Sequence, residues 1–399
     1  MRVLHLADIH AREKDFVEVS TCMNSIVVEA YEIKPDLIAI AGDCFDSQEI
    51  KLDSNSTKML FQMLAGLADV APVIIVMGTP SHDGNAPLVF QHIKAKYEIY
   101  ISHRPEVLFL AGSKICLEPD DMAPYKPELI ISTTPTPTKQ YFRTDAGVQE
   151  SDALIAEALT DLFISFGSLA NQFDCPHIHV GHYQVGGAYI SDTQQLIGRD
   201  IEISIDQISL AQADLVCLGH IHKPQQIGKN VFYSGSIFRK DWGELEDKGF
   251  YVHEIHKKGG VPFSRFIKTP TRKLFKTELD KTQGDISGDL AGVPEAADIK
   301  DAFVKIAVKI YRDDVPLFNS KLIKQFYLDA GAQDVKIELI QIPRENVRSA
   351  NFITLRTTGE KLTEQAEIKN EEIPAGVLEK VERLETEPAD KIIDEVTKL

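Results

Sequence analysis

The most constraining feature of the sequence is a repeated pattern in which a short, β-branched apolar run is followed by glycine, aspartate or histidine. Runs of this kind occupy residues 3–7, 37–41, 73–77, 178–180 and 215–218. Their length and composition are typical of buried strands. Between the first two runs, apolar residues recur at spacings of three and four, which predicts a helix. Strands that alternate with helices in this way predict an α/β core.

The composition limits the classes of protein that the chain can represent. Its 399 residues suffice for two or three domains, and 43% hydrophobic with 26% charged residues is ordinary globular composition. The apolar runs are far shorter than the roughly 18 residues of a membrane span, and the five cysteines show no paired spacing. We therefore expect a cytoplasmic protein without a membrane association. A net charge of −17 argues against coating nucleic acid by bulk electrostatics, but it leaves open a nuclease whose acidic side chains hold cations.

The pattern changes beyond residue 255. Residues 280–300 read as a linker, residues 303–310 alternate in polarity like a strand, and a helix and a second strand follow at about 318–330 and 334–341. From residue 360 the chain is acidic and helical, with prolines at 374 and 388. We predict three domains, namely an α/β domain at 1–279, a small α/β domain at 280–345 and a helical tail at 346–399.

Acidic and imidazole side chains follow five of the apolar runs. In open α/β sheets, functional groups gather at the carboxyl ends of the strands. Carboxylate and imidazole together suit manganese, iron or zinc better than calcium, and a carboxylate such as Asp43 can bridge two ions. The sequence therefore predicts a two-metal site that acts on a phosphoryl group. The fragments in chain order are Asp8-Ile9-His10, Gly42-Asp43-Cys44-Phe45-Asp46, Ser81-His82-Asp83, Gly181-His182 and Gly219-His220-Ile221-His222.

In this order the fragments resemble the calcineurin-like metallophosphoesterase superfamily. The segments at 181–187, 218–225 and 233–236 (Gly-His-Tyr-Gln-Val-Gly-Gly, Leu-Gly-His-Ile-His-Lys-Pro-Gln and Tyr-Ser-Gly-Ser) are similar to SbcD-type DNA nucleases. The resemblance implies a core of two mixed β-sheets flanked by helices, a small α/β cap domain and a C-terminal helical tail.

The resemblance also implies a role for each residue of the site, with two divalent ions, most simply manganese. The first ion is implied to contact Asp8, His10, Asp43 and His222, and the second Asp43, His182, His220 and Ser81. His82 is implied to be a catalytic residue that binds no metal, and Asp83 is implied to orient it. The family's Gly-Asn-His-Asp is here Gly78-Thr79-Pro80-Ser81-His82-Asp83, so Ser81 stands at the position of the asparagine ligand. Either its hydroxyl weakens the second site, or water takes over that ligand role.

The implied function is metal-dependent cleavage of DNA, as an exonuclease or endonuclease, in repair, recombination or replication. The implied partners are DNA and an SMC-like ATPase of the SbcC type, with a homodimer inside a heterotetramer. Two alternatives stay open, namely a phosphoesterase for small phosphodiesters or phosphoproteins, and a non-catalytic scaffold. A basic window either contacts DNA or forms a solvated face, and it includes Arg265, Lys268, Arg272 and Lys273. For Asp46 we expect a supporting role, and for His5, His177 and His179 packing within the core.

Overall fold

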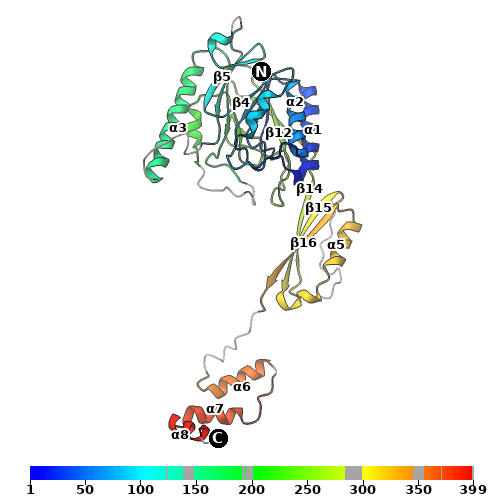
Figure 1. The fold of residues 1–399 in the computed structure, drawn as a ribbon, viewed down its shortest axis with the longest axis vertical. Coiled ribbons are helices and arrows are strands. Elements are labelled where there is room, and N and C mark those ends of the chain that lie inside the picture. The colour runs from blue at the N-terminus through cyan, green and yellow to red at the C-terminus, as the bar shows by residue number, and fades with distance from the viewer. Residues whose placement is uncertain are drawn as a thin grey trace. The chain divides into compact units, whose positions relative to one another are not determined.

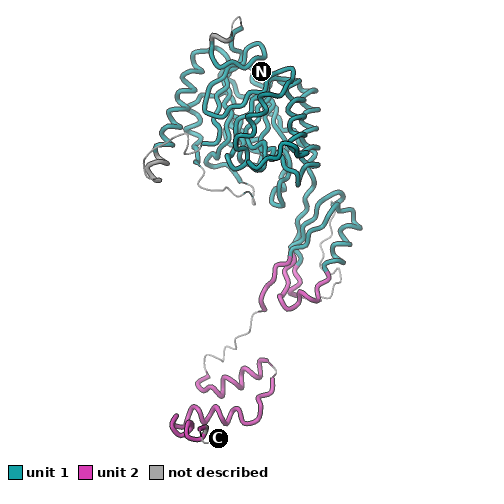
Figure 2. The backbone as a smooth tube through the Cα atoms, viewed as in Figure 1, with its two compact units in different colours: residues 1–279, 292–307, 320–338 teal, residues 280–291, 308–319, 339–399 magenta. Residues whose placement is uncertain are grey.

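A computed structural model describes residues 1–122, 125–137, 148–190, 194, 201–283, 299–344, 355–369 and 371–397. The chain divides into two compact units (Figure 2). The first comprises residues 1–279, 292–307 and 320–338, and the second comprises residues 280–291, 308–319 and 339–399. The division into 1–279, 280–345 and 346–399 remains a prediction, and its second boundary lies outside the described residues.

The first sheet has six strands in the order β13-β12-β1-β2-β3-β4. Its four parallel strands are β1 (Arg2–Leu6), β2 (Leu37–Ala41), β3 (Val73–Val76) and β4 (Ile99–Ser102). Two antiparallel strands, β12 (Gly249–Glu254) and β13 (Phe263–Lys268), extend it beyond β1. A chain segment more than 240 residues from the N-terminus thus pairs with the first strand.

The second sheet has seven strands in the order β10-β11-β9-β8-β7-β5-β6. Its parallel strands are β7 (Leu129–Thr134), β8 (His177–His182), β9 (Leu215–Gly219) and β11 (Val231–Tyr233). The antiparallel strands are β5 (Glu106–Ala111), β6 (Lys114–Cys116) and β10 (Gln225–Gln226). Two mixed sheets confirm the predicted fold class.

Helices cover the outer faces of the two sheets (Figure 1). The apolar faces of α1 (Phe16–Ile33) and α2 (Asn55–Ala68) pack on the first sheet, and α3 (Val148–Ala170) and α4 (Ile205–Ser209) pack on the second. Successive strand residues point to opposite faces. In β1, Leu4 and Leu6 accordingly pack against the helices, whereas Val3 packs between the sheets. Burial on both faces explains the nearly continuous apolar runs of the sequence.

Local signals explain where the elements begin. Helix α2 begins at Asn55, because the Ser54 hydroxyl accepts a hydrogen bond from the Thr57 N–H at 3.2 Å and caps the helix. Short 3₁₀ turns occupy η1 (Glu13–Asp15), η2 (Ala86–His92), η3 (Pro119–Met122) and η4 (Arg312–Leu317). The strands β4 to β7, β10 and β12 to β14 were not part of the sequence prediction.

The remaining elements follow β13. A three-stranded sheet has the order β14-β15-β16, from β14 (Lys273–Asp280), β15 (Ala302–Tyr311) and β16 (Asp334–Ile342), with α5 (Ser320–Asp329) between the last two in sequence. Alternate residues of β15 are buried, which confirms the predicted amphipathic strand. The tail forms α6 (Thr358–Lys369), α7 (Val377–Thr386) and α8 (Ala389–Val396). No helix in the described part of the chain is long and apolar enough to cross a membrane.

Candidate metal centre

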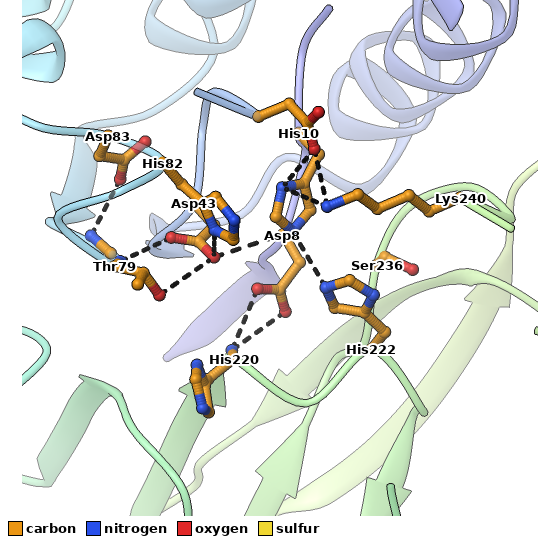
Figure 3. A network of polar contacts seen from close by, with 12 residues as sticks. Asp8, His10, Asp43, Thr79, His82, Asp83, His220, His222, Ser236 and Lys240 are labelled. Atoms are coloured by element: carbon orange, nitrogen blue, oxygen red, sulfur yellow. Dashed lines mark hydrogen bonds and ion pairs between the residues drawn. The ribbon is translucent and has the colours of Figure 1, made fainter. Parts of the chain in front are cut away.

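The candidate site lies where β1, β2, β8 and β9 end. The segments that follow β1 and β2 continue to run together, because the Asp8 N–H donates to the Gly42 carbonyl and the His10 N–H donates to the Asp43 carbonyl, both at 3.0 Å. The side chains of Asp8, His10 and Asp43 therefore converge on one place (Figure 3). The sequence prediction that the strand ends meet at a common edge is confirmed for these two strands.

The backbone at this edge is strained. Eight non-glycine residues have positive φ in the part of the chain that the structure describes, and four of them belong to the candidate site. These are Asp8 (52°), His10 (44°), Asp43 (51°) and His220 (92°). An L-residue in this region costs about 1–2 kcal/mol. Strain of this kind persists where the surrounding structure fixes it, and it gathers at functional sites.

One group of three donors contains Asp8, His10 and His222, whose donor atoms lie within 4.8 Å of one another. The Nε2 atoms of His10 and His222 are 3.0 Å apart. Two imidazole nitrogens at this distance share either a proton or a cation. Burial lowers the pKa of His10 to about 3, so its imidazole is neutral at pH 7. A buried donor set that combines a neutral imidazole with a carboxylate fits a divalent ion.

A second group contains Asp8, Asp43 and His182, so that the two groups share Asp8. The Nδ1 atom of His182 is hydrogen-bonded to the Ala41 carbonyl at 2.7 Å, and its Nε2 atom lies 3.4 Å from Asp43 Oδ2. A carbonyl only accepts, so Nδ1 carries a proton and Nε2 faces the carboxylate. Burial opposes a charge on His182, but the Asp43 carboxylate raises the pKa of His182 to about 9.

The imidazole of His82 belongs to a third group of three donors, together with His10 and Asp43. Its Nδ1 atom is 2.7 Å from Asp43 Oδ2, and about a quarter of the side chain (24%) is exposed. Burial alone would lower the pKa of His82, but the hydrogen bond to Asp43 raises it. For Asp43 the effects are reversed. Burial would raise the pKa of its carboxyl group, but His182 and His82 hold that pKa well below its usual range. With His10 Nε2 also 3.7 Å from Asp43 Oδ2, three histidines approach this carboxylate.

The structure differs from the expectation that Asp83 orients His82. The buried carboxylate of Asp83 accepts hydrogen bonds from the N–H groups of Phe45 at 3.1 Å and Gly78 at 2.9 Å. Burial and the nearby Asp43 raise the pKa of Asp83 to about 7. Asp83 thus joins the loops that follow β2 and β3, and Asp43 is the residue that holds the His82 ring.

Thr79, not Ser81, occupies the place beside Asp43 and His182. The Thr79 N–H donates to Asp43 Oδ1 at 2.6 Å, and its hydroxyl lies 3.3 Å from His182 Nε2 and 3.4 Å from Asp43 Oδ2. Ser81 has an exposed side chain. The reason is a helical turn after Thr79, in which its carbonyl accepts the N–H groups of His82 and Asp83. This turn absorbs the two additional residues and carries Ser81 outward.

His220 contributes its backbone to the site. Its N–H donates to both carboxylate oxygens of Asp8, at 3.0 and 3.2 Å, and its ring is directed away from Asp8 (Figure 3). The ring stacks edge-on against His182 with 5.2 Å between centroids. Among the described residues, His220 belongs to none of the three-donor groups.

Comparison with known proteins adds to this geometry. Residues 1–224 match the family model described as calcineurin-like phosphoesterase. The chain belongs to this family. Its curated relatives include the SbcD component of nuclease SbcCD from Staphylococcus epidermidis, which is 24% identical over 292 residues, or 70% of this chain and 73% of the relative. The corresponding protein from Staphylococcus saprophyticus is 24% identical over 278 residues, or 64% and 66% of the two chains.

Two solved structures are similar to this chain at lower sequence identity. One is an anchor in the inner membrane complex of Plasmodium, with a TM-score of 0.44 and 15% identity over 68% of this chain and 85% of the other. The second is a dimetal phosphatase from Danio rerio, with a TM-score of 0.39 and 10% identity over 66% and 98% of the two chains.

The basic residues expected to contact DNA lie among acidic neighbours. Arg272 is bonded to Asp15 at 3.3 Å and to the Arg239 carbonyl at 2.8 Å, which indicates a structural role within the phosphoesterase core. Lys268 pairs with Asp247 at 2.5 Å. Arg265 lines a cavity of about 320 Å³ together with three glutamates, and Lys273 is exposed at the start of β14. These contacts do not form a continuous basic face, so they give no support to the DNA-binding interpretation of these four residues.

A second cluster of metal-binding residue types lies in the core, where His5, Cys217 and His253 come together. His5 Nε2 is 3.2 Å from the Leu218 carbonyl, the His5 and His253 rings meet at 3.4 Å, and His253 Nδ1 is 2.7 Å from the Ser264 hydroxyl. One assignment of protons satisfies all four ring nitrogens, so the cluster needs no ion.

His177 and His179 are also buried, and both are hydrogen-bonded to Ser132, which agrees with their predicted packing role.

Several residues near the metal groups escaped the sequence prediction. Lys240 Nζ lies 2.7 Å from Asp46 Oδ1 and 3.3 Å from His10 Nδ1. Asp46 also approaches His10 Nδ1 at 3.4 Å, in keeping with its expected supporting role. The buried Glu244 is bonded to His222. Lys240 and Glu244 belong to the loop between β11 and β12, which carries no periodic pattern, so only the charge pair at positions 244 and 248 could have drawn attention to it.

Proposed function

We propose that this phosphoesterase is a two-metal-dependent DNA nuclease that acts with an SMC-like ATPase of the SbcC type. The observation that carries the proposal is the pair of three-donor groups that share Asp8 at one strand edge. Two such groups are what hydrolysis of a phosphodiester by paired cations requires. The similarity to the SbcD component of a nuclease over 70% of the chain supports DNA as the substrate.

In this proposal the two groups hold two divalent ions, most simply manganese. Asp8, His10 and His222 contact one ion, whereas Asp43 and His182 contact the other, with the Thr79 hydroxyl beside them. The family resemblance adds His220 to the second set and makes Asp43 a shared ligand. When bound, the ions supply an activated water and neutralise charge on the phosphoryl oxygens.

In this proposal His82 acts on the departing sugar oxygen. Its Nδ1 atom is engaged by Asp43, so Nε2 is the ring atom left to meet a substrate, and the side chain is partly open to solvent. The hydrogen bond to Asp43 raises the pKa of His82 and favours a protonated ring. We therefore assign His82 as the general acid that protonates the leaving group.

The C-terminal helices are proposed to bind the ATPase. Their apolar residues are exposed, with 65% of Leu384 and 57% of Ile393 accessible, and an ion pair from Arg383 to Glu395 joins α7 to α8. An exposed apolar stripe on a helix is typical of a partner-binding surface.

We further propose that two copies of each protein form a heterotetramer. The five cysteines, all in described segments, form no disulfide, which favours a reducing cytoplasm.

The decisive experiment is digestion of end-labelled double- and single-stranded DNA by the full chain, with manganese and with a chelator. We expect cleavage with manganese alone, and none in Asp43→Ala. A chromogenic diester, bis-p-nitrophenyl phosphate, serves as the parallel substrate. Hydrolysis of this diester without any cleavage of DNA would assign the protein to small phosphodiesters, and no hydrolysis of either would support the scaffold alternative.

The partner is tested by deletion of residues 355–399. The truncated protein should retain manganese-dependent hydrolysis of the diester, because the metal groups lie within residues 1–240. It should no longer co-purify with a co-expressed SbcC-type ATPase. Association that survives the deletion would contradict the assignment of the tail.

A further inference from the structure

A buried charge pair stands directly behind one of the candidate metal ligands. Glu244 Oε1 is 2.7 Å from His222 Nδ1, and the carboxylate is fully buried. Lys248, whose side chain is also fully buried, lies 3.0 Å from Glu244 Oε2. These two residues come from the loop between β11 and β12, which supplies no residue to the metal groups themselves.

We propose that Glu244 is a positioning residue that sets which nitrogen of His222 faces the metal group. A carboxylate only accepts hydrogen bonds, so the proton of the neutral ring stays on Nδ1. The lone pair of Nε2 then points to His10 and Asp8, where the two Nε2 atoms meet at 3.0 Å. Ligating histidines are commonly oriented in this way by a second carboxylate. The inference rests on the proposed metal-dependent function.

The second carboxylate oxygen of Glu244, Oε2, also has two partners. Oε2 accepts from the Lys240 backbone N–H at 2.9 Å as well as from Lys248. Lys248 in turn donates to the His222 carbonyl and to Glu246, both at 2.8 Å. Glu244 therefore fixes the ring of His222, and Lys248 fixes its backbone carbonyl.

Stability alone does not explain a buried pair of charges. Replacing such a pair with apolar residues of similar volume is often neutral or stabilising, because the desolvation cost offsets the attraction. A carboxylate is nevertheless retained here, aimed at the ring nitrogen that does not face the metal group. That direction is the feature that distinguishes a positioning role from a purely structural one.

The test measures the tautomer of His222 directly. In metal-free protein labelled with ¹⁵N-histidine, the His222 signals, assigned by their loss in His222→Gln, should show the proton on Nδ1. In Glu244→Ala they should shift toward the other tautomer, and titration calorimetry should show manganese affinity at one of two sites lowered by about 10–100-fold. Glu244→Gln, whose amide oxygen still accepts from Nδ1, should recover most of this affinity and keeps the test open if Glu244→Ala does not fold.

The matched control is Asp214→Asn. Asp214 is also a buried carboxylate, which accepts from the N–H groups of His177 at 2.9 Å and Gly259 at 2.6 Å, away from the metal groups. This variant should lose stability but keep the His222 tautomer and both manganese affinities. A folded Glu244→Ala protein with wild-type tautomer and affinity would overturn the proposal. Failure of the wild-type protein to cleave DNA would instead refute the proposed function, because the tautomer is measured without metal or substrate.

Discussion

We predict that the substitution Gly42→Ala disrupts the candidate site by displacing the His182 side chain. It links β2 to Asp43 with a φ of +85°, and a Cβ atom added to it would stand 2.2 Å from His182 Nδ1 and 2.8 Å from the Gly78 Cα atom. Contacts this short force one partner to move. The Gly78 backbone is tied to the Asp83 carboxylate, so the His182 ring is the group that gives way in Gly42→Ala.

The expected loss has two parts. The left-handed backbone costs an alanine about 1–2 kcal/mol. Displacement of the His182 ring also breaks its 2.7 Å hydrogen bond to the Ala41 carbonyl, which contributes about 1 kcal/mol. We therefore expect a loss of roughly 2–3 kcal/mol in the free energy of unfolding. A misplacement of about 1 Å at a reacting centre can cost 100-fold in rate, so hydrolysis should fall by at least that factor.

The control Gly187→Ala separates the backbone cost from the effect of displacing His182. Gly187 has the same φ of +85°, but a Cβ atom there would meet nothing within 4 Å. This control should lose only the backbone contribution and retain activity. Urea unfolding gives the stability of both variants, manganese calorimetry reports the metal groups, and a chromogenic phosphodiester reports turnover. Equal activity in the two variants would refute the reasoning that the close approach of residue 42 to His182 shapes the site.

Three further predictions concern catalysis, metal binding and pH. His82→Ala should lower phosphodiester cleavage by about 10²–10⁴-fold at unchanged manganese content, and turnover near the wild-type rate would remove His82 from the mechanism. Thr79→Asn should shift manganese activation to lower concentration, because an amide oxygen is a stronger ligand than a hydroxyl, whereas Ser81→Asn should leave the activation curve unchanged, since its side chain is exposed. Burial lowers the pKa of His5 and of His179 to about 3, below the unfolded value of 6.5, so the unfolded chain binds protons first on acidification. The free energy of unfolding should therefore fall as the pH drops below about 6.5, by up to about 1.4 kcal/mol per unit for each histidine, as urea midpoints at pH 7.5 and 5.5 would show.

The sequence predicts the residues at the strand ends well, for a physical reason. Four of the five fragments directly follow an apolar run, and the ends of parallel strands in one sheet lie at one edge. Asp8, Asp43 and His182 are found in one three-donor group. Asp8 and Asp43 follow strands of the first sheet and His182 follows a strand of the second, so only the structure shows that these ends meet.

The loop after β3 shows where this reasoning ends. Counting back from His82 places Ser81 at the ligand position, but the helical turn after Thr79 places the two additional residues on the other side of that position. The pattern of residue types is the same for both arrangements. Asp83 is a similar case, since adjacent residues need not point the same way, and its carboxylate turns to the backbone of Phe45 and Gly78.

Two buried carboxylates of like charge lie together at this edge of the sheet. Asp8 and Asp43 are both buried in one group, and burial raises the pKa of Asp8, whereas His182 and His82 hold the pKa of Asp43 well below its usual range. The Asp43 carboxylate raises the pKa of His182 to about 9, and it also raises the pKa of His82. A cation bound by Asp43 would compete with these histidines for the carboxylate and would relieve its like-charge repulsion with Asp8. The same carboxylate therefore connects metal binding to the protonation of the residue that we assign as general acid.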